Sequence, residues 1–300
     1  MPYNCKECSK EFNSKSGLHR HLKSHDLSIG GYYTLYYPRN DKYSGKPLPF
    51  KNYDDYFSVD FANKRNMRLW CHSGGVEEVR EFLTTSLQAR MENKGLEYAP
   101  CLLDLETSKM PTIFNYEDSF GSYQKACDEI SVEPMFPDTT TLELNIFDGS
   151  MFIDSREQSP LEFKNSEVTK IDIGDYLLQD EYTYTYVDRK SFEDFRSTLS
   201  GGFDRFCGEI ERAITLDSYL FVVVESDLEK SDTKYGWKKK TAPLSFTYNR
   251  MREVVNKYPR RVQFVFSGSR DGSKKIIPEL LLRGKELWNC DVQRSLNGLD

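Results

Sequence analysis

The sequence has no long run of apolar residues. Hydrophobic residues make up 38% of its 300 positions and charged residues 29%, whereas a membrane-spanning helix needs about 20 mostly apolar residues in succession. The opening residues, 1–5, also lack the apolar core of a secretory signal. We therefore expect an intracellular protein with no membrane partner, in the cytoplasm of a bacterium or phage-infected host, or in the nucleus of a eukaryote.

Cysteines with disulfide-like spacing are also missing. The chain has 7 cysteines, an odd number, and only Cys5 and Cys8 lie close together in the sequence. The others are scattered at Cys71, Cys101, Cys127, Cys207 and Cys290. In a chain without a secretory signal, this usage indicates a reducing compartment.

The sequence has no excess of positive charge. Its formal net charge is −6 and its calculated pI is about 5.5, which excludes a protein whose whole surface is basic. Binding to nucleic acid requires only a local basic face, so the net charge does not exclude it.

Metal-ligating residues near the N-terminus have the spacing Cys-x2-Cys-x12-His-x3-His, formed by Cys5, Cys8, His21 and His25. This is the full pattern of a two-Cys, two-His zinc finger, with cysteines on a hairpin and histidines on one face of a helix. The apolar positions of the pattern are Tyr3, Phe12 and Leu18. Such a small core does not fold without metal, so the sequence predicts a ββα finger over residues 1–26 that binds Zn²⁺.

The finger's partner is open to two interpretations. Positions that read bases in DNA-binding fingers are occupied here by Ser14, Gly17 and Arg20, and only arginine is a strong base reader. The finger could instead contact DNA phosphates through Lys15, Arg20 and Lys23, or it could bind a protein. Of the two kinds of partner, we favour nucleic acid. His19 lies off the ligand pattern and is expected to face solvent.

Residues 27–147 are predicted to form an aromatic-rich, helical region and linker with a DNA-binding role. Apolar residues at helical spacing predict a helix over 76–90, and residues 116–130 indicate a second helical unit. Within it, Phe120-Gly121-Ser122-Tyr123 resembles the helical repeats attached to phage and intron homing endonucleases. An ordinary helical linker is an equally good interpretation of the same residues.

A metal-dependent phosphodiesterase site is indicated further along the chain. Gly174-Asp175 is followed by Asp188-Arg189-Lys190 and then by Asp194. On a strand, Asp188 and Lys190 would point to one face because they are two residues apart, and Asp175 could meet them from a neighbouring strand. Carboxylate oxygens are the ligands that Mg²⁺ prefers.

Residues 151–226 resemble the XPF-type nuclease domain, a branch of the PD-(D/E)XK nucleases. The signature of that family is G-D, a gap, E-R-K, three residues and D. Further matching blocks are Ile153-Asp154-Ser155-Arg156-Glu157, Arg205-Phe206 with Glu209, and Phe221-Val222-Val223-Val224-Glu225. The chain departs from the family in having Asp188 in place of the usual Glu, which leaves a carboxylate ligand. It also lacks the tandem helix-hairpin-helix of eukaryotic members, so we expect targeting to come from the N-terminal parts or from a partner.

The resemblance implies an α/β fold over residues 148–300, with a restriction-endonuclease-like mixed sheet flanked by helices. The expected strands are 151–155, 168–173, 183–190, 219–225 and 262–266. The expected helices are 192–199, 203–216 and 246–257, with another at the C-terminus. A run of lysines, residues 238–240, is a candidate DNA clamp or an exposed loop.

The site residues are expected to divide the chemistry among them. Asp175 and Asp188 would ligate Mg²⁺ or Mn²⁺, with Asp154 completing the site directly or through water. Lys190 would orient the attacking water and offset the charge of the transition state. Arg189 is expected to organise the carboxylates or grip phosphate, and Asp194 to support Arg189 or Lys190. Arg205 and Glu209 could support the site, face DNA, or belong to a salt-bridged helix face.

The sequence therefore predicts a metal-dependent DNA endonuclease acting in repair, recombination, replication or DNA mobility. Two alternatives within this class stay open, a branched-DNA resolvase and a homing-type or nicking enzyme. Pairing with a second subunit through the nuclease domain is a further expectation. The alternative from another class is a non-catalytic DNA-binding or scaffold subunit, against which the retained acidic residues and Lys190 argue.

Overall fold

The computed structural model describes residues 3–38, 64–73, 75–228 and 244–298. The lysine run at 238–240 lies outside these residues. The chain divides into two compact units, one of residues 1–86 and 109–122, the other of residues 87–108 and 123–300. In the part of the chain described, no helix is both long enough and apolar enough to cross a membrane.

The N-terminal segment has the predicted ββα arrangement. Strands β1 (Tyr3–Asn4) and β2 (Glu11–Phe12) pair antiparallel and precede helix α1 (Lys15–His21). The side chain of Ser14 caps α1 by accepting a 3.1 Å hydrogen bond from the N–H of Gly17, as is common at helix N-termini. A 3-10 turn, η1 (Leu22–His25), continues the helix.

A second helix, α2 (Ile29–Tyr36), packs against this segment. Tyr32 is fully buried in a small core with Cys5, Leu18 and Leu22, and its hydroxyl accepts a 2.9 Å hydrogen bond from the N–H of Lys6. His19, which was expected to face solvent, is half-buried, and its Nε2 lies 3.2 Å from the hydroxyl of Tyr33 on α2. The aromatic residues just beyond the metal-ligand pattern thus enlarge a core that would otherwise be very small.

In the described part of the first unit, the next helices are α4 (Lys64–Ser73), the start of α5 (Val76–Lys94) and α7 (Ile113–Phe120). The predicted helix over 76–90 is therefore confirmed. Arg80 joins α5 to α7, donating a 3.1 Å hydrogen bond to the carbonyl of Ser119 and stacking its guanidinium on Phe120. The predicted helical unit at 116–130 contains a break at Gly121, whose φ of +84° ends α7 before α8 (Tyr123–Asp128) begins.

The second unit is built on a 6-stranded mixed sheet with the order β4-β3-β5-β6-β7-β8. Its strands are β3 (Ser150–Asp154), β4 (Asn165–Thr169), β5 (Tyr176–Leu178), β6 (Thr185–Lys190), β7 (Tyr219–Val224) and β8 (Val262–Phe266). β5 runs antiparallel to β3 and β6, and the other neighbouring strands are parallel. β7 is buried along its whole length, as expected of a central parallel strand.

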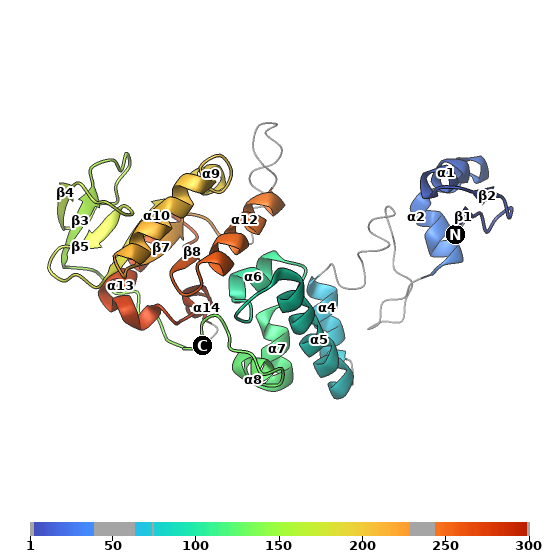
Figure 1. Ribbon diagram of the computed structural model, residues 1–300, viewed down its shortest axis with the longest axis horizontal. Helices are drawn as coiled ribbons and strands as arrows, with labels where there is room; N and C mark the ends of the chain where they lie inside the picture. The colour runs from blue at the N-terminus through green and yellow to red at the C-terminus, as the bar shows by residue number, and fades with distance from the viewer. Residues whose placement is uncertain (1–2, 39–63, 74, 229–243, 299–300) are drawn as a thin grey trace. The chain divides into compact units, whose positions relative to one another are not determined.

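Helices cover both faces of this sheet (Figure 1). One face carries α9 (Phe192–Thr198), α10 (Phe203–Thr215) and α12 (Leu244–Lys257), with Phe195 and Phe206 packed on Phe264 of β8. The opposite face carries α13 (Arg270–Arg283), η2 (Gly284–Leu287) and α14 (Val292–Leu296). A short helix, α6 (Leu102–Thr107), packs against α12 and α14. The predicted fold class, a mixed sheet flanked by helices, is confirmed.

Two predicted elements differ from the structure. The strand expected at 168–173 lies earlier, at Asn165–Thr169, and the buried residues Ile171 and Ile173 belong to the segment that follows it. β5 was not predicted, because a strand of three residues is too short to show a period. The expected C-terminal helix is divided into α13, η2 and α14.

Glutamine side chains close the outer edge of β8. Gln293, 4% exposed, accepts a 2.6 Å hydrogen bond from the N–H of Phe266 and donates one of 3.4 Å to its carbonyl. Gln263 accepts a 3.2 Å hydrogen bond from the N–H of Val292 on α14. Gln293 thus satisfies backbone groups of Phe266 that an edge strand would otherwise leave unpaired, and Gln263 joins β8 to α14.

Replacement of this edge contact should destabilise the second unit. Gln293→Ala leaves the buried N–H of Phe266 without an acceptor, so the free energy of unfolding in urea should fall by about 1–3 kcal/mol. Gln88→Ala, at an exposed position on α5, is the control and should change it by less than about 0.5 kcal/mol. Equal stability of the two variants would contradict this role of Gln293.

Candidate active site and metal centre

The alternation of β6 separates three consecutive charged side chains. Asp188 and Lys190 lie on one face of the strand, and Arg189 lies on the other. Asp188 is 4% exposed. The Nζ of Lys190 lies 3.0 Å from Oδ1 and 2.7 Å from Oδ2 of Asp188. The predicted pair therefore comes together as an ion pair inside the sheet.

The expected third member, Asp175, enters from the segment that leads into β5. Because Tyr176 is paired with Val187 in antiparallel register, Asp175 lies opposite Asp188. Its Oδ2 accepts a 2.8 Å hydrogen bond from the N–H of Arg189, and its own N–H donates to the carbonyl of Val187 at 2.7 Å.

Glycine is required at the residue before Asp175. Gly174 has a φ of +66°, and a Cβ there would lie 2.7 Å from the carbonyl oxygen of Val187. Both the left-handed backbone and the close approach to β6 exclude a side chain. The Gly-Asp pair of the motif is thus what allows this segment to lie against β6.

Sequence reasoning did not place Glu209 among the catalytic residues, but the structure brings it to the same site. It lies on α10, and its Oε1 accepts a 2.9 Å hydrogen bond from the N–H of Gly174. The signal was present in the sequence, as the spacing of Arg205, Phe206 and Glu209, but that spacing also fits an ordinary helix face. Arg205 itself is exposed on α10.

The carboxylates of the site repel one another electrostatically. Burial, and next the charge of Asp188, raise the pKa of Asp175 to about 8. Burial and Asp188 also raise the pKa of Glu209 above its ordinary value. Burial lowers the pKa of Lys190, but Asp188, Asp175 and Glu209 outweigh it and hold that pKa above its usual range. One ammonium does not balance the carboxylates of Asp188, Asp175 and Glu209, so the fully ionised site carries an excess of negative charge.

Arg189 is the centre of an ion network on the opposite face of β6. Its Nη1 donates to Glu225 at 2.6 Å, and its Nη2 donates to Glu157 at 3.0 Å and to the carbonyl of Ser159 at 2.8 Å. Burial lowers the pKa of Arg189, but Glu225 and Glu157 outweigh it and raise that pKa further above its already high value. The side chain is only 6% exposed and is held by carboxylates.

Asp154 is engaged in a separate ion pair. Its Oδ1 accepts from Nε of Arg156 at 2.7 Å, and its Oδ2 accepts from the N–H of Ile171, also at 2.7 Å. Burial raises the pKa of Asp154, but these hydrogen bonds outweigh it and leave the pKa below its ordinary value. The backbone N–H of Asp154 donates to the carbonyl of Asp175 at 2.9 Å, so the residue borders the site while its carboxylate is already occupied.

Asp194 pairs with Ser191, the residue that caps α9, instead of supporting the site. Its Oδ2 accepts a 2.7 Å hydrogen bond from the hydroxyl of Ser191, whose Oγ in turn accepts from the N–H of Asp194 at 3.2 Å. This is the N-terminal cap of α9. Within the described residues, no hydrogen bond or ion pair joins Asp194 to Arg189 or Lys190, so the expected support is not made.

The four predicted ligands of the finger converge. Cys8 Sγ lies 3.2 Å from His21 Nε2, Cys5 Sγ lies 3.6 Å from His25 Nε2, and the two histidine Nε2 atoms are 3.0 Å apart. All four ligand atoms lie within 4.8 Å of one another, and the group could hold a metal ion. Lys15 is partly exposed, and Arg20 and Lys23 are exposed.

Comparison with known proteins gives matches among solved structures alone. No protein-family model and no curated protein match the chain. The chain is similar to XPF from Aeropyrum pernix, with 18% identity over 46% of this chain and 67% of that one and a TM-score of 0.34. It is also similar to XPF from Aeropyrum pernix in complex with DNA, with 19% identity over 46% of this chain and 66% of that one and a TM-score of 0.35. The chain thus spans about two thirds of the length of these structures.

The raised pKa of Asp175 predicts a pH-dependent stability for the metal-free protein. The folded state holds this proton more tightly than the unfolded state does, so stability is full below the unfolded pKa of 3.8 and is lost as the pH rises toward about 8. In EDTA, unfolding by urea between pH 5 and 9 should show this fall in wild type, and Asp175→Asn should flatten it. Asp180→Asn, at an exposed carboxyl, should leave the profile as in wild type; a wild-type profile in Asp175→Asn would refute the assignment.

Proposed function

We propose that this protein is a metal-dependent DNA endonuclease that hydrolyses phosphodiester bonds. The observation that carries the proposal is the meeting of three carboxylates around Lys190: Asp188 on β6, Asp175 on the segment that leads into β5, and Glu209 on α10. Two carboxylates whose pKa values are raised by burial and by Asp188, with a single ammonium beside them, form a site suited to a divalent cation and a phosphate.

The donor set fits Mg²⁺ or Mn²⁺. Asp175 and Asp188 are the residues that would hold the ion, and Glu209 is a further candidate, because all three supply hard oxygen ligands. The excess negative charge of the site is what such an ion would neutralise. When bound, the ion would supply the Lewis acidity that phosphodiester hydrolysis requires. Asp154 would act indirectly, because Arg156 and Ile171 already occupy its carboxylate oxygens.

The chain's own residues divide the remaining work. Lys190, held by Asp188, would orient the attacking water and offset the negative charge that develops on the phosphate. Arg189 would keep β6 in place through Glu157 and Glu225 and would not touch substrate, since its guanidinium is buried and paired. Asp194 would contribute by fixing the start of α9.

The choice of DNA as substrate rests on the sequence motifs shared with XPF-type nucleases. Structure-selective cleavage of branched DNA and site-specific nicking are both compatible with this site, as is a homodimer or heterodimer formed through the nuclease domain. Exposed Lys23, Arg20 and Arg205, together with Lys15, would contact DNA phosphates. Residues 27–147 would serve as a further DNA-binding region and linker.

For the N-terminal segment we propose a zinc finger over residues 1–26. Three of the separations between ligand atoms, 3.0–3.6 Å, are close to the edges of a tetrahedron with bonds of about 2.0–2.3 Å, the lengths usual for zinc, and all four atoms lie within 4.8 Å of one another. Two thiolates and two imidazoles are the ligand set of structural zinc sites. The finger would add affinity for DNA and take no part in the hydrolysis.

The first experiment tests the nuclease. Wild type with Mg²⁺ should cleave at least one member of a labelled panel of duplex, single-stranded, flap and junction DNA. Lys190→Ala should lower the cleavage rate by about 100-fold or more, because it removes the charge that faces the reacting phosphate. Lys275→Ala, at an exposed position on α13, is the matched control and should cleave as wild type does.

The outcomes separate the alternatives. Cleavage of flaps, forks or junctions identifies a branched-DNA resolvase, and cleavage of a plain duplex at one site identifies a nicking enzyme. Full activity of Lys190→Ala would refute the active-site assignment. Tight DNA binding without cleavage of any substrate would favour a non-catalytic scaffold subunit.

The second experiment tests the zinc site. Purified protein should contain one zinc per chain by elemental analysis, and His25→Ala should lose it. Because the small core depends on the metal, proton NMR of an isolated fragment spanning residues 1–38 should show unfolding when a chelator is added. His19→Ala lies off the ligand set and should keep the zinc; a metal-free fragment that stays folded would contradict the proposal.

A further inference from the structure

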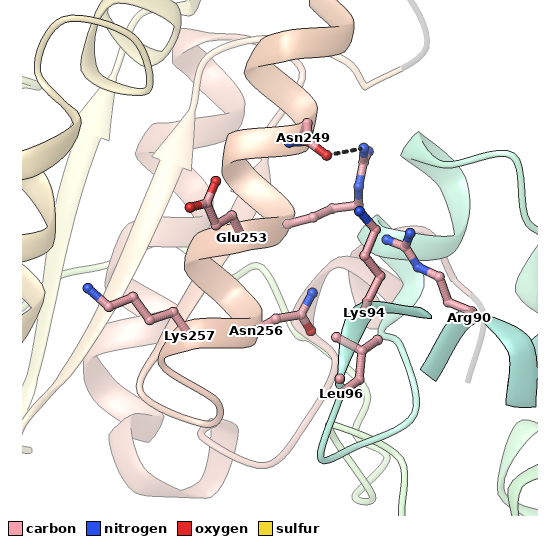
Figure 2. Close-up of a pocket in the computed structure, with 9 residues that line it drawn as sticks. Arg90, Lys94, Leu96, Asn249, Glu253, Asn256 and Lys257 are labelled. Atoms are coloured by element: carbon pink, nitrogen blue, oxygen red, sulfur yellow. Dashed lines mark hydrogen bonds between the residues drawn. The ribbon is translucent and has the colours of Figure 1, made fainter. Parts of the chain in front are cut away.

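A second polar feature, here called the basic pocket, lies between the end of α5 and one face of α12 (Figure 2). Both elements belong here to the second compact unit. The pocket has a volume of about 320 Å³, at the lower end of the range for small-ligand sites. The lining residues that matter below are Arg90, Lys94, Asn249, Arg252, Asn256 and Lys257, none of which belongs to the candidate active site.

Hydrogen-bond donors converge on this pocket from two elements. Asn249, Arg252 and Asn256 are spaced three and four residues apart and so share one face of α12. Figure 2 shows Arg90 and Lys94 reaching toward that face from the other side of the pocket. The last turn of α5 is closed by the N–H of Leu96, which donates to the carbonyl of Met91 at 3.0 Å.

Fixed contacts hold the arginines at the back of the pocket. Arg90 Nη2 donates to both oxygens of Asp104, at 2.9 and 3.1 Å, and Asn256 Nδ2 donates to the same carboxylate at 3.3 Å. Arg252 Nη1 donates to the carbonyl and the hydroxyl of Thr107, at 2.7 and 2.9 Å. The guanidinium groups are therefore ordered before any ligand arrives, which lowers the entropic cost of binding.

Positive charge exceeds negative charge around the pocket. The buried carboxylate of Asp104 is shared by Arg90 and Asn256. Burial, and also the neighbouring Arg90, lower the pKa of Arg252 despite the opposing effect of Asp104. The acidic residue of the lining, Glu253, is held by Arg250 at 2.8 Å.

The lysines of the pocket differ in how far they are paired. Lys257 lies 3.5 Å from Glu211, whereas the exposed Lys94 makes no ion pair with any described residue. Lys94 is therefore the side chain best placed to contribute charge to a ligand.

We propose that the basic pocket binds a phosphate group of a nucleic-acid strand. Guanidinium groups and amide donors suit phosphate oxygens, and a row of donors along one face of α12 suits the repeated charges of a backbone. The same chemistry would accept the phosphate of a free nucleotide. The proposal rests on the proposed function and deepens it, because it adds a binding site for the DNA strand that is separate from the candidate active site.

The test compares charge reversal at two exposed lysines of the intact chain. Lys94→Glu and Lys275→Glu are each made in the Lys190→Ala background, so that Mg²⁺ can be present without cleavage. Binding of a fluorescent single-stranded oligonucleotide is measured by anisotropy over a range of salt concentrations. Inorganic phosphate and a deoxynucleoside monophosphate are titrated separately by calorimetry.

Lys94→Glu should raise the Kd for the oligonucleotide about tenfold near 0.1 M salt and reduce the slope of log K against log salt by about 1. Lys94→Arg keeps the positive charge and should keep both wild-type values. Lys275→Glu should change neither. Equal values for Lys94→Glu and Lys275→Glu would overturn the proposal.

The remaining arms identify the source of the phosphate. Suppose that Lys94→Glu loses monophosphate binding while its oligonucleotide binding is unchanged. That result would overturn the proposal that the pocket binds a nucleic-acid strand and would assign the pocket to a free nucleotide. Because binding is measured without cleavage, failure of the nuclease assay does not alter this comparison. A chain that cuts nothing but shows the Lys94 effect would refute the proposed function and support the pocket.

Discussion

The burial of charge in a central strand is the constraint on which the rest of the site depends. β6 lies between β5 and β7, yet its last three residues are charged, and a buried charge is costly unless it is paired. Because neighbouring side chains alternate between faces, each face needs its own solution. Asp188 is paired with Lys190 on one face, and Arg189 is paired with Glu157 and Glu225 on the other. These partners come from the segment after β3 and the end of β7, so pairing Arg189 also fixes three segments of the second unit.

The two faces are not balanced in the same way. Arg189 is matched by two carboxylates and a carbonyl, which makes that face a structural anchor. The face of Asp188 has one ammonium for three neighbouring carboxylates, and it is there that the pKa values of Asp175 and Glu209 are raised. A fold selected for stability alone would not gather these carboxyl groups, because a carboxyl pKa raised on folding lowers the free energy of unfolding near neutral pH. The imbalance is what a site that takes up a cation would require.

Sequence patterns predicted the long, regular elements well and the side-chain partnerships less well. β8 has the predicted bounds, and β7, α9 and α10 differ from prediction by one residue each, because long apolar runs and amphipathic periods have few alternative structures. The shared face of Asp188 and Lys190 followed from strand alternation, whereas Asp175 was expected only as a residue that could meet them from a neighbouring strand. The partners of Asp154 and Asp194 did not, because competition from Arg156 and from the helix cap depends on loop geometry. The contact of His19 with Tyr33 was not predicted, because Tyr33 lies on a helix outside the finger pattern.

Under the proposed function, the affinity for DNA and the chemical step must depend on different residues, because the catalytic centre is acidic and the substrate is a polyanion. The carboxylates that would hold the metal repel a phosphate backbone, and the net charge of −6 adds no general attraction. Affinity must therefore come from local basic features elsewhere in the chain, such as Arg20 and Lys23 on the finger, Arg205 on α10, and the basic pocket. Salt screens those contacts, whereas the chemical step depends on the metal and on Lys190. Salt should therefore weaken binding while leaving the rate of the bound complex nearly unchanged, and removal of the divalent ion should abolish the rate while the basic features still hold DNA.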